Sequence, residues 1–262
     1  MTVIDLAFLK DSVEPFEEFL LSLPIGTLFT GELYKISDER FPGLSLEGFS
    51  EEPMWLDATS VGRLFMAPDG STVAALNVSE CDDGTPAGVK MISDNEFVQE
   101  DEPVTIVAYQ DEGGPHVRID SLHLVRVMLN KDAPARFCTV AFGLMACTAY
   151  RNGFTKISLF AGGNGPPPVD LEDGDLIGYF VWPKFGFDAP LLPVDLNRAP
   201  AHLRGCSNVL DVVEADPAWW EAHGRGQEMY FDLTAGSTSW KVLLNYIYTV
   251  LLENDDEHEE EA

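Results

Sequence analysis

Four consecutive segments between His116 and Ala161 indicate the fold class. They read HVRIDSLHLVRVML (116–129), NKDAPA (130–135), RFCTVAFGLMACTAYR (136–151) and, after NGFT, KISLFA (156–161). The first segment predicts a long strand, the third has an apolar stripe at helical spacing, and the last predicts a buried strand. Asn152-Gly153 is a typical helix end. A helix and a strand joined by so short a turn form half of an α/β crossover, which predicts an α/β fold.

Upstream of these segments, the sequence predicts a hairpin and several further elements. PVTIVAYQ (103–110) predicts a strand that pairs with 116–129 through the turn 111–115. Strands are also expected at 28–34 and 72–78, and long loops between them. Near the N-terminus, Asp11 or Ser12 is a possible cap for a helix whose apolar face includes Phe16 and Leu20, and Pro24 with Gly26 would end it.

Downstream, Gly162 to Pro168 predicts a loop, and an aromatic segment GYFVWPKFGFD follows at 178–188. A strand is expected at 229–233, and a last helix that Ser237 or Ser239 would cap. No composition shift suggests a linker. We therefore expect one α/β domain over residues 1–252, with a disordered acidic tail at 253–262, where seven acids and no base would repel one another.

The net charge excludes several classes of function. Sixteen Lys and Arg against 44 Asp and Glu give a formal charge of −28, which repels phosphate backbones and anionic lipid surfaces. No apolar run approaches the roughly 20 residues of a membrane span, and the first ten residues lack the pattern of a secretory signal. The expected partners include neither nucleic acid nor membrane, and the expected compartment is the cytoplasm.

The charge is not evenly distributed. Residues 115–160, here called the positive segment, hold six basic and two acidic residues, whereas residues 1–114 hold five and 23. Two interpretations are open. The positive segment is either core that has lost its acids for packing reasons, or the place where an anionic ligand docks.

Common catalytic and metal-binding motifs are absent from the sequence. There is no phosphate-binding loop, dinucleotide fingerprint, zinc-protease helix or nucleophile elbow. The four cysteines stand far apart and predict free thiols, mostly buried, rather than a metal knuckle or a disulfide scaffold. Cys138 is the exception to watch, because a thiol at a helix N-terminus often has a lowered pKa. The five histidines show no metal-ligand spacing, so no metal is expected.

The order of hairpin, loop, Gly-ended helix, buried strand and Gly-Phe segment resembles the GNAT superfamily of N-acetyltransferases. The matching parts are the strand 116–129, the helix 136–151 with Gly153, the strand 156–161 and the pair Gly186-Phe187. More narrowly, GYFVWPKFGFD and WWEAHGRGQEMYFDLTAGSTSWKVL (219–243) resemble GNAT-like domains of bacterial and phage-associated proteins. The resemblance covers roughly residues 100–250. It implies a mixed, twisted sheet with helices on both faces.

The resemblance also implies a cofactor site for acetyl-CoA. The strand end Val127, Met128 and Leu129 would pair with the pantetheine. The helix N-terminus would hold the pyrophosphate through Arg136 and the amides of Phe137, Cys138, Thr139 and Ala141. Such a helix end offers unpaired N–H groups and a partial positive charge.

The family's cofactor loop contains glycines that this chain lacks. One register places Arg136, Thr139 and Ala141 on the loop motif, and a register counted back from Gly153 places Ala133, Arg136 and Cys138 there. Neither restores the glycines that let a backbone approach phosphate closely.

Three residues are implied in catalysis. Asp120 or His123 would accept the proton of the acceptor amine, and their odd separation puts them on opposite faces of a strand. Trp182 occupies the place of the family's usual acid, so Tyr179, one turn earlier, would protonate the leaving thiolate if the segment is helical.

The expected function is transfer of an acetyl group from acetyl-CoA to an amine, with a basic acceptor favoured by the acidic surface. The alternative is a catalytically inactive GNAT-like protein that presents its acidic surface to a basic protein. A third interpretation is that the acidity adapts the chain to high salt.

Overall fold

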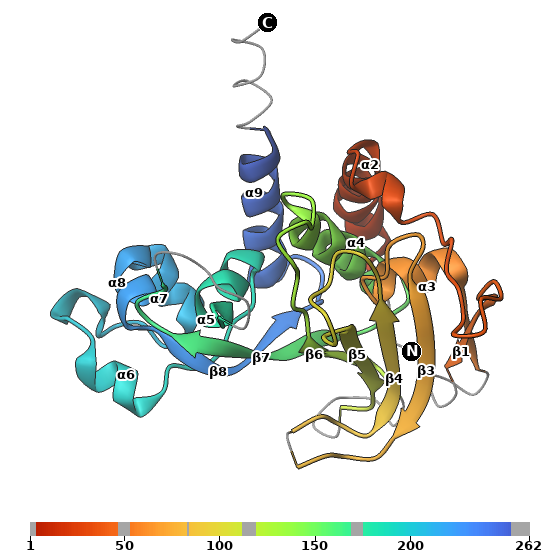
Figure 1. Cartoon of the computed structure of the whole chain (residues 1–262). Coiled ribbons are helices and arrows are strands. Elements are labelled where there is room, and N and C mark those ends of the chain that lie inside the picture. The colour runs from red at the N-terminus through yellow and green to blue at the C-terminus, as the bar shows by residue number, and fades with distance from the viewer. Residues whose placement is uncertain (1–3, 47–52, 83, 112–118, 169–174, 253–262) are drawn as a thin grey trace, which may run out of the picture. The chain divides into compact units, whose positions relative to one another are not determined.

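The computed structural model describes residues 4–46, 53–82, 84–111, 119–168 and 175–252 (Figure 1). It shows a mixed α/β fold, as the sequence predicted. One sheet has six strands in the order β3-β4-β5-β6-β7-β8, and a second sheet consists of β1 and β2. The expected disordered tail at 253–262 lies outside the described residues.

The chain divides into two compact units. Unit 1 comprises Met1–Ile157 with Leu233–Ala235, and unit 2 comprises Ser158–Asp232 with Gly236–Ala262. The boundary falls inside strand β7 rather than at a linker. The expectation of a single domain over residues 1–252 stays a prediction.

Unit 1 is built on four antiparallel strands that follow one another along the chain (Figure 1). The predicted strand 72–78 is confirmed as β3, and the two paired strands of the predicted hairpin as β5 and β6, with Tyr109 opposite Ser121. Residues 112–118, which include most of the predicted turn, lie outside the described residues. The sequence did not predict β4. Strand β6 ends at Arg126, because the chain beyond it pairs with another segment, Val98 bridging to Leu129. The bounds of the strands are β3 Thr72–Val78, β4 Gly88–Asp94, β5 Val104–Tyr109 and β6 Ser121–Arg126.

Helix α4 (Phe137–Arg151) is the central helix of unit 1 and confirms the predicted helix and its end. All of its residues from Thr139 to Tyr150 are buried, and it packs against α2 (Glu14–Ser22) and α3 (Ala58–Leu64). Gly153 follows with a φ of +76°, a left-handed backbone that favours glycine, and its N–H donates to the carbonyl of Tyr150.

The N-terminal helix starts earlier than predicted. Asp5, not Asp11 or Ser12, is the cap, because its Oδ1 accepts the N–H groups of Ala7 and Phe8. The short α1 (Leu6–Phe8) continues through a π-helical turn (Leu9–Val13) into α2. The predicted apolar face of this helix is confirmed, because Phe16 and Leu20 are fully buried.

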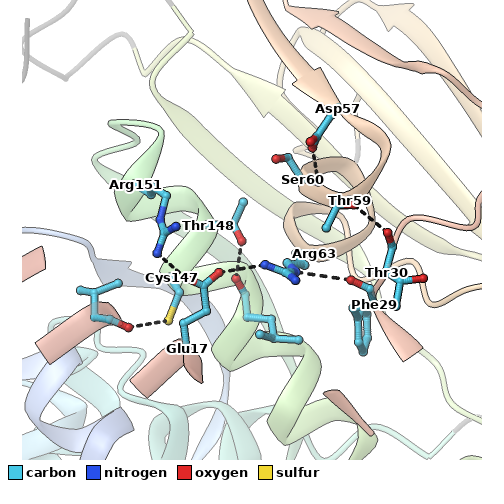
Figure 2. Close-up of polar contacts among 12 residues, drawn as sticks. Glu17, Phe29, Thr30, Asp57, Thr59, Ser60, Arg63, Cys147, Thr148 and Arg151 are labelled. Carbon is cyan, nitrogen blue, oxygen red and sulfur yellow. Dashed lines mark hydrogen bonds and ion pairs between the residues drawn. The ribbon is translucent and has the colours of Figure 1, made fainter. Parts of the chain in front are cut away.

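A buried carboxylate joins the three helices of unit 1. Glu17 on α2 is 6% exposed and forms ion pairs with Arg63 on α3, at 3.1 Å, and with Arg151 on α4 (Figure 2). The thiol of Cys147 on α4 lies 3.9 Å from the carbonyl of Val13. Burial, followed by the negative charge of Glu17, raises the pKa of this thiol well above its usual value. Glu17 therefore has a structural role, and Cys147 is unreactive.

The segment 28–34 does not form the strand that was predicted. Its backbone instead wraps around a carboxylate, because Asp69 accepts the N–H groups of Thr30, Gly31 and Glu32. A 3-10 turn (Gly26–Leu28) precedes it. The loops expected between residues 35 and 71 contain two short strands and a helix, β1 (Gly43–Leu46), β2 (Met54–Asp57) and α3.

Unit 2 contains a strand pair and a set of short helices. The predicted strands 156–161 and 229–233 are confirmed as β7 (Lys156–Asn164) and β8 (Arg225–Asp232). Strand β7 runs on through Gly162–Asn164, where a loop was expected. The predicted last helix is α9, and the Ser237 hydroxyl accepts the N–H of Trp240 at its start. The helices are α5 Gly178–Val181, α6 Pro193–Arg198, α7 Val209–Ala215, α8 Pro217–His223 and α9 Thr238–Leu252, with 3-10 turns at Trp182–Phe185 and Ala201–Leu203.

Candidate active site

Asp120 stands at the start of β6 and is the most unusual carboxylate of unit 1. It is 1% exposed, yet its Oδ2 has no hydrogen-bond partner within the described parts of the chain. Its Oδ1 accepts from the N–H of Asp111, at 3.1 Å, and from the hydroxyl of Ser121, at 3.0 Å. A buried polar atom without a partner costs free energy, so this oxygen is an acceptor in need of a donor.

The backbone of Asp120 fixes where its side chain lies. Its N–H donates to the carbonyl of Tyr109 on β5, and its carbonyl accepts both the N–H and the hydroxyl of Thr155. Hydrogen bonds therefore connect the backbone of Asp120 to strand β5 and to the turn between α4 and β7. Such anchoring holds a reacting group in a defined orientation.

Asp111, whose N–H donates to Asp120, also takes part in an ion pair. Lys156 forms an ion pair with Asp111, with 2.7 Å between Nζ and Oδ2. Burial lowers the pKa of Lys156, but its interactions with Asp111 and Tyr109 outweigh burial and raise the pKa overall. Lys156 therefore stays charged and engaged with Asp111, and Asp120 keeps its free oxygen.

His123 lies on β6, opposite Val107, and faces away from the buried Leu122 and Leu124. Its ring meets the edge of Tyr109, with 6.4 Å between the ring centroids. The two predicted proton acceptors contact Tyr109 in different ways, Asp120 through its backbone N–H and His123 through its ring. Sequence reasoning missed Tyr109, Asp111 and Lys156 because the hairpin register that brings them to Asp120 is a tertiary feature.

The predicted pyrophosphate site lies at the N-terminus of α4. Arg136 has a φ of +68°, and the N–H of the following Phe137 donates to the carbonyl of Pro134. The N–H groups of Cys138 and Thr139 have no acceptor within the residues that the structure describes. A left-handed backbone favours glycine, so Arg136 adopts a conformation that is unfavourable for its side chain.

The side chains behind this helix end are buried. Phe137 stacks on Phe29 and also contacts Phe97, with ring centroids 5.9 and 5.1 Å apart. Thr139 and Ala141 are buried as well. The expectation of a lowered thiol pKa at Cys138 is wrong, because burial raises the pKa of this thiol to about 12.

The strand end at Val127, Met128 and Leu129 is half-buried and partly bonded. The carbonyl of Met128 accepts the backbone N–H of Gln99, and the carbonyl of Leu129 accepts its side-chain amide. Two of the groups predicted to pair with pantetheine are therefore occupied by another segment of unit 1.

Tyr179 belongs to unit 2, in the short helix α5, so the segment is helical, which is one condition for Tyr179 to act as the acid. Its side chain is fully buried, and its hydroxyl donates to the carbonyl of Glu221. Burial, with a smaller contribution from Glu221, raises the pKa of Tyr179. Trp182, four residues before Gly186, begins the following 3-10 turn.

The four cysteines are free, as predicted, but only Cys147 is fully buried, and Cys81 is exposed. Where the chain is described, no group of three or more His, Cys, Asp or Glu could hold a metal ion. The same residues include no helix with the length and apolar character needed to cross a bilayer.

The chain matches no family model, no curated protein and no solved structure. The class that the structure itself defines is a mixed α/β protein with a buried, partly unsatisfied carboxylate directly before a central strand.

Proposed function

We propose that the protein transfers an acetyl group from acetyl-CoA to an amine, with Asp120 as the proton acceptor. The observation that carries the proposal is the buried Asp120 Oδ2, which has no donor within the described residues. Carboxylates with an open position in a buried site are typical general bases.

The reaction requires a neutral amine, because a protonated amine has no lone pair with which to attack the thioester. Acetyl-CoA supplies a thioester whose carbonyl carbon accepts the amine, and the C–N bond forms as the C–S bond breaks. Asp120 takes the amine proton on Oδ2, while Asp111 and Ser121 hold Oδ1 in place. The hydrogen bonds to Oδ1 therefore leave Oδ2 as the oxygen that accepts the proton in this proposal.

The N-terminus of α4 suits an anion. Two unbonded N–H groups, at Cys138 and Thr139, and the guanidinium of Arg136 come from one helix end, and a 15-residue helix carries a substantial dipole. Neither Arg136 nor Lys131 has an ion-pair partner in the described part of the chain. These groups fit a pyrophosphate, whereas the carbonyls of Met128 and Leu129 are open to pantetheine only if Gln99 releases them.

Tyr179 has one property that an acid requires. The hydroxyl is protonated at neutral pH, as an ordinary phenol is, although the raised pKa of Tyr179 makes it a weaker proton donor. Its hydrogen bond to the carbonyl of Glu221 would have to break before it could protonate a thiolate. Its role as the acid stays a prediction.

The acceptor is proposed to be a cationic amine, because the net charge of −28 attracts cations. The four free thiols suit a reducing compartment, which supports the cytoplasm as the location. Turnover of a cationic and a neutral amine at low salt tests the acceptor, since equal rates would exclude charge selection.

Calorimetry with acetyl-CoA tests the cofactor. We expect binding by the natural chain and a loss of at least about tenfold in affinity in the Arg136→Glu variant. Lys241→Glu is the matched control, because it makes the same charge change at an exposed residue of α9 and should leave binding intact. No heat with the natural chain would end the cofactor proposal, and unchanged binding by Arg136→Glu would misplace the site.

The second candidate is a non-catalytic protein that binds a basic partner. It is favoured by the Gln99 contacts to Met128 and Leu129 and by the lack of loop glycines. In that case Gln99→Ala would leave acetyl-CoA binding undetectable. If Gln99 merely competes with pantetheine, the same variant would bind acetyl-CoA more tightly.

A further inference from the structure

Strand β3 ends the six-stranded sheet and leaves part of its outer edge unpaired. The N–H of Val73 donates outward to the carbonyl of Tyr34, so alternation along the strand also directs the backbone groups of Ala75 and Asn77 outward. Neither Ala75 nor Asn77 has a backbone partner on that side among the described residues. Tyr34 covers only the first part of the edge, and the rest offers hydrogen bonds to another strand.

This edge lacks the features that usually block strand addition. Edge strands are commonly protected by Lys, Pro or a bulge, because an open edge recruits other chains. The sequence TVAALNV of β3 contains no charge and no proline, and its pairing with β4 is continuous. Leu76, in the middle of the open part, is 50% exposed. The edge is therefore available and apolar.

A groove of about 500 Å³ lies along the open part of β3. Strand β1 contributes Leu44 and Ser45, and Val89 and Ile119 line the groove with residues 75–78 of β3. Figure 1 shows β1 and β3 near each other at one end of unit 1. An extended chain adding to β3 would place every second side chain toward this groove.

Charge indicates which chain would bind there. Residues 1–114, which supply all but one of the groove residues, carry 23 acidic and five basic side chains. The turn after β3 adds the exposed residues Glu80 and Asp82. A second copy of this chain would bring a further −28, which opposes pairing of two β3 edges.

We propose that the open edge of β3 binds an extended, basic peptide segment of a partner protein as an added antiparallel or parallel strand. Backbone hydrogen bonds to Ala75 and Asn77 hold the segment, and its apolar side chains enter the groove beside Leu76. Its basic side chains face the acidic surroundings. The site does not depend on the proposed acetyl transfer.

Three synthetic peptides test this proposal by fluorescence anisotropy with the full chain at low salt. The first alternates Lys and Val over eight residues, the second replaces Lys by Glu, and the third carries N-methyl groups on every second amide of the first. We expect binding of the Lys-Val peptide and at least about tenfold weaker binding of the other two. Equal binding of the N-methylated peptide would overturn strand addition and leave charge attraction alone.

Two variants locate the site. Asn77→Pro removes an outward N–H and adds a ring at the edge, which edge strands tolerate, and we expect it to weaken binding of the Lys-Val peptide about tenfold. Asn77→Ser keeps the N–H and should bind as the natural chain does. Because the peptide series needs no variant, a misfolded Asn77→Pro protein would not remove the test.

Sedimentation equilibrium tests whether a second copy of this chain, rather than a basic peptide, occupies the edge of β3. We expect a monomer at low salt that does not compete with the peptide. A dimer that Asn77→Pro dissociates would overturn the proposal, because it would show that a second copy fills the edge. Unchanged peptide binding by Asn77→Pro would also overturn it.

Discussion

At position 120, Asn keeps the shape of the side chain but cannot accept a proton at Oδ2. We expect Asp120→Asn to lower kcat by about 10²-fold or more, the usual contribution of a general base, with acetyl-CoA affinity unchanged. The measurement is steady-state turnover with a cationic amine, together with calorimetry for acetyl-CoA.

His123 provides the matched comparison for this experiment, because it also borders Tyr109. His123→Gln should leave kcat within about threefold if Asp120 is the base. A large loss in His123→Gln with little loss in Asp120→Asn would assign the proton to His123 instead.

At position 17, the buried carboxylate forms ion pairs with two arginines from different helices (Figure 2). Glu17→Gln removes that charge and should lower the free energy of unfolding by about 2 kcal/mol. The value is below that of a fully buried pair, because Arg63 and Arg151 retain contact with water. Urea denaturation measures it.

Glu18 is the control for Glu17, since it is the neighbouring residue on α2 and is exposed. Glu18→Gln should change stability by less than about 0.5 kcal/mol. Equal effects of the two substitutions would mean that the ion pairs of Glu17 contribute nothing beyond the general charge.

At the scale of elements, the start of α4 depends on a left-handed residue that is not glycine. Arg136→Gly removes the steric cost of a φ of +68° and should keep stability or raise it by up to about 1 kcal/mol. Arg136→Val should lower it by about 1–2 kcal/mol, because β-branched residues resist this conformation. Thermal and urea unfolding measure both, and equal stability of the two variants would contradict the assigned backbone.

Helix α3 depends on a cap that titrates. Asp57 accepts the N–H of Ser60 at 2.7 Å, and hydrogen bonds to Ser60 lower the pKa of Asp57. A lowered folded pKa stabilises the fold above the ordinary pKa near 4 and loses this contribution as the pH falls through the folded value. Asp57→Ala should therefore cost about 1 kcal/mol at pH 7, and the difference should shrink below about pH 4. A difference independent of pH in urea titrations would exclude the charged cap.

Long elements with strong end signals could be predicted from the sequence, and short ones could not. Helix α4 was correct because 15 residues carry one apolar pattern that ends at Gly153. Strands β1 and β2, of four residues each, lie in a segment rich in Gly, Pro and acids, where periodicity carries no information. The segment 28–34 was wrong because Asp69, almost 40 residues away, binds its backbone.

Some features of the candidate site could likewise be predicted from the sequence, and others could not. The sequence identified Asp120 and His123 as titratable residues on one predicted strand. In the structure, Asp120 contacts Tyr109 through its backbone N–H, and His123 contacts it through its ring. The sequence could not identify the unpartnered Oδ2 of Asp120 or the Asp111–Lys156 ion pair. Both depend on the pairing register of β5 and β6 and on the position of the start of β7. The raised pKa of the half-buried Cys138 likewise depends on tertiary packing.

For the whole molecule, the positive segment is less positive than its composition suggests. Arg126, Arg151 and Lys156 form ion pairs with acids from other parts of unit 1, which supports the packing interpretation for half of its bases. Arg118 lies outside the described residues. Among the described bases of the segment, Lys131 and Arg136 remain without an ion-pair partner, and both lie in the loop before α4.

The net charge of −28 should make the stability of the protein depend on salt concentration. Repulsion among 44 acids opposes the compact state, and salt screens it with a Debye length of about 8 Å at 0.15 M. We expect the free energy of unfolding to rise by about 1 kcal/mol between 0.01 and about 0.3 M NaCl, or about 2 °C in Tm, and then to level off. Differential scanning calorimetry measures this rise. A chain that folds only above about 1 M salt would instead support high-salt adaptation, because screening is complete well below that concentration. A plateau at moderate salt leaves the acidity available for what the local features indicate, a cationic acceptor near Asp120 or a basic strand at the edge of β3.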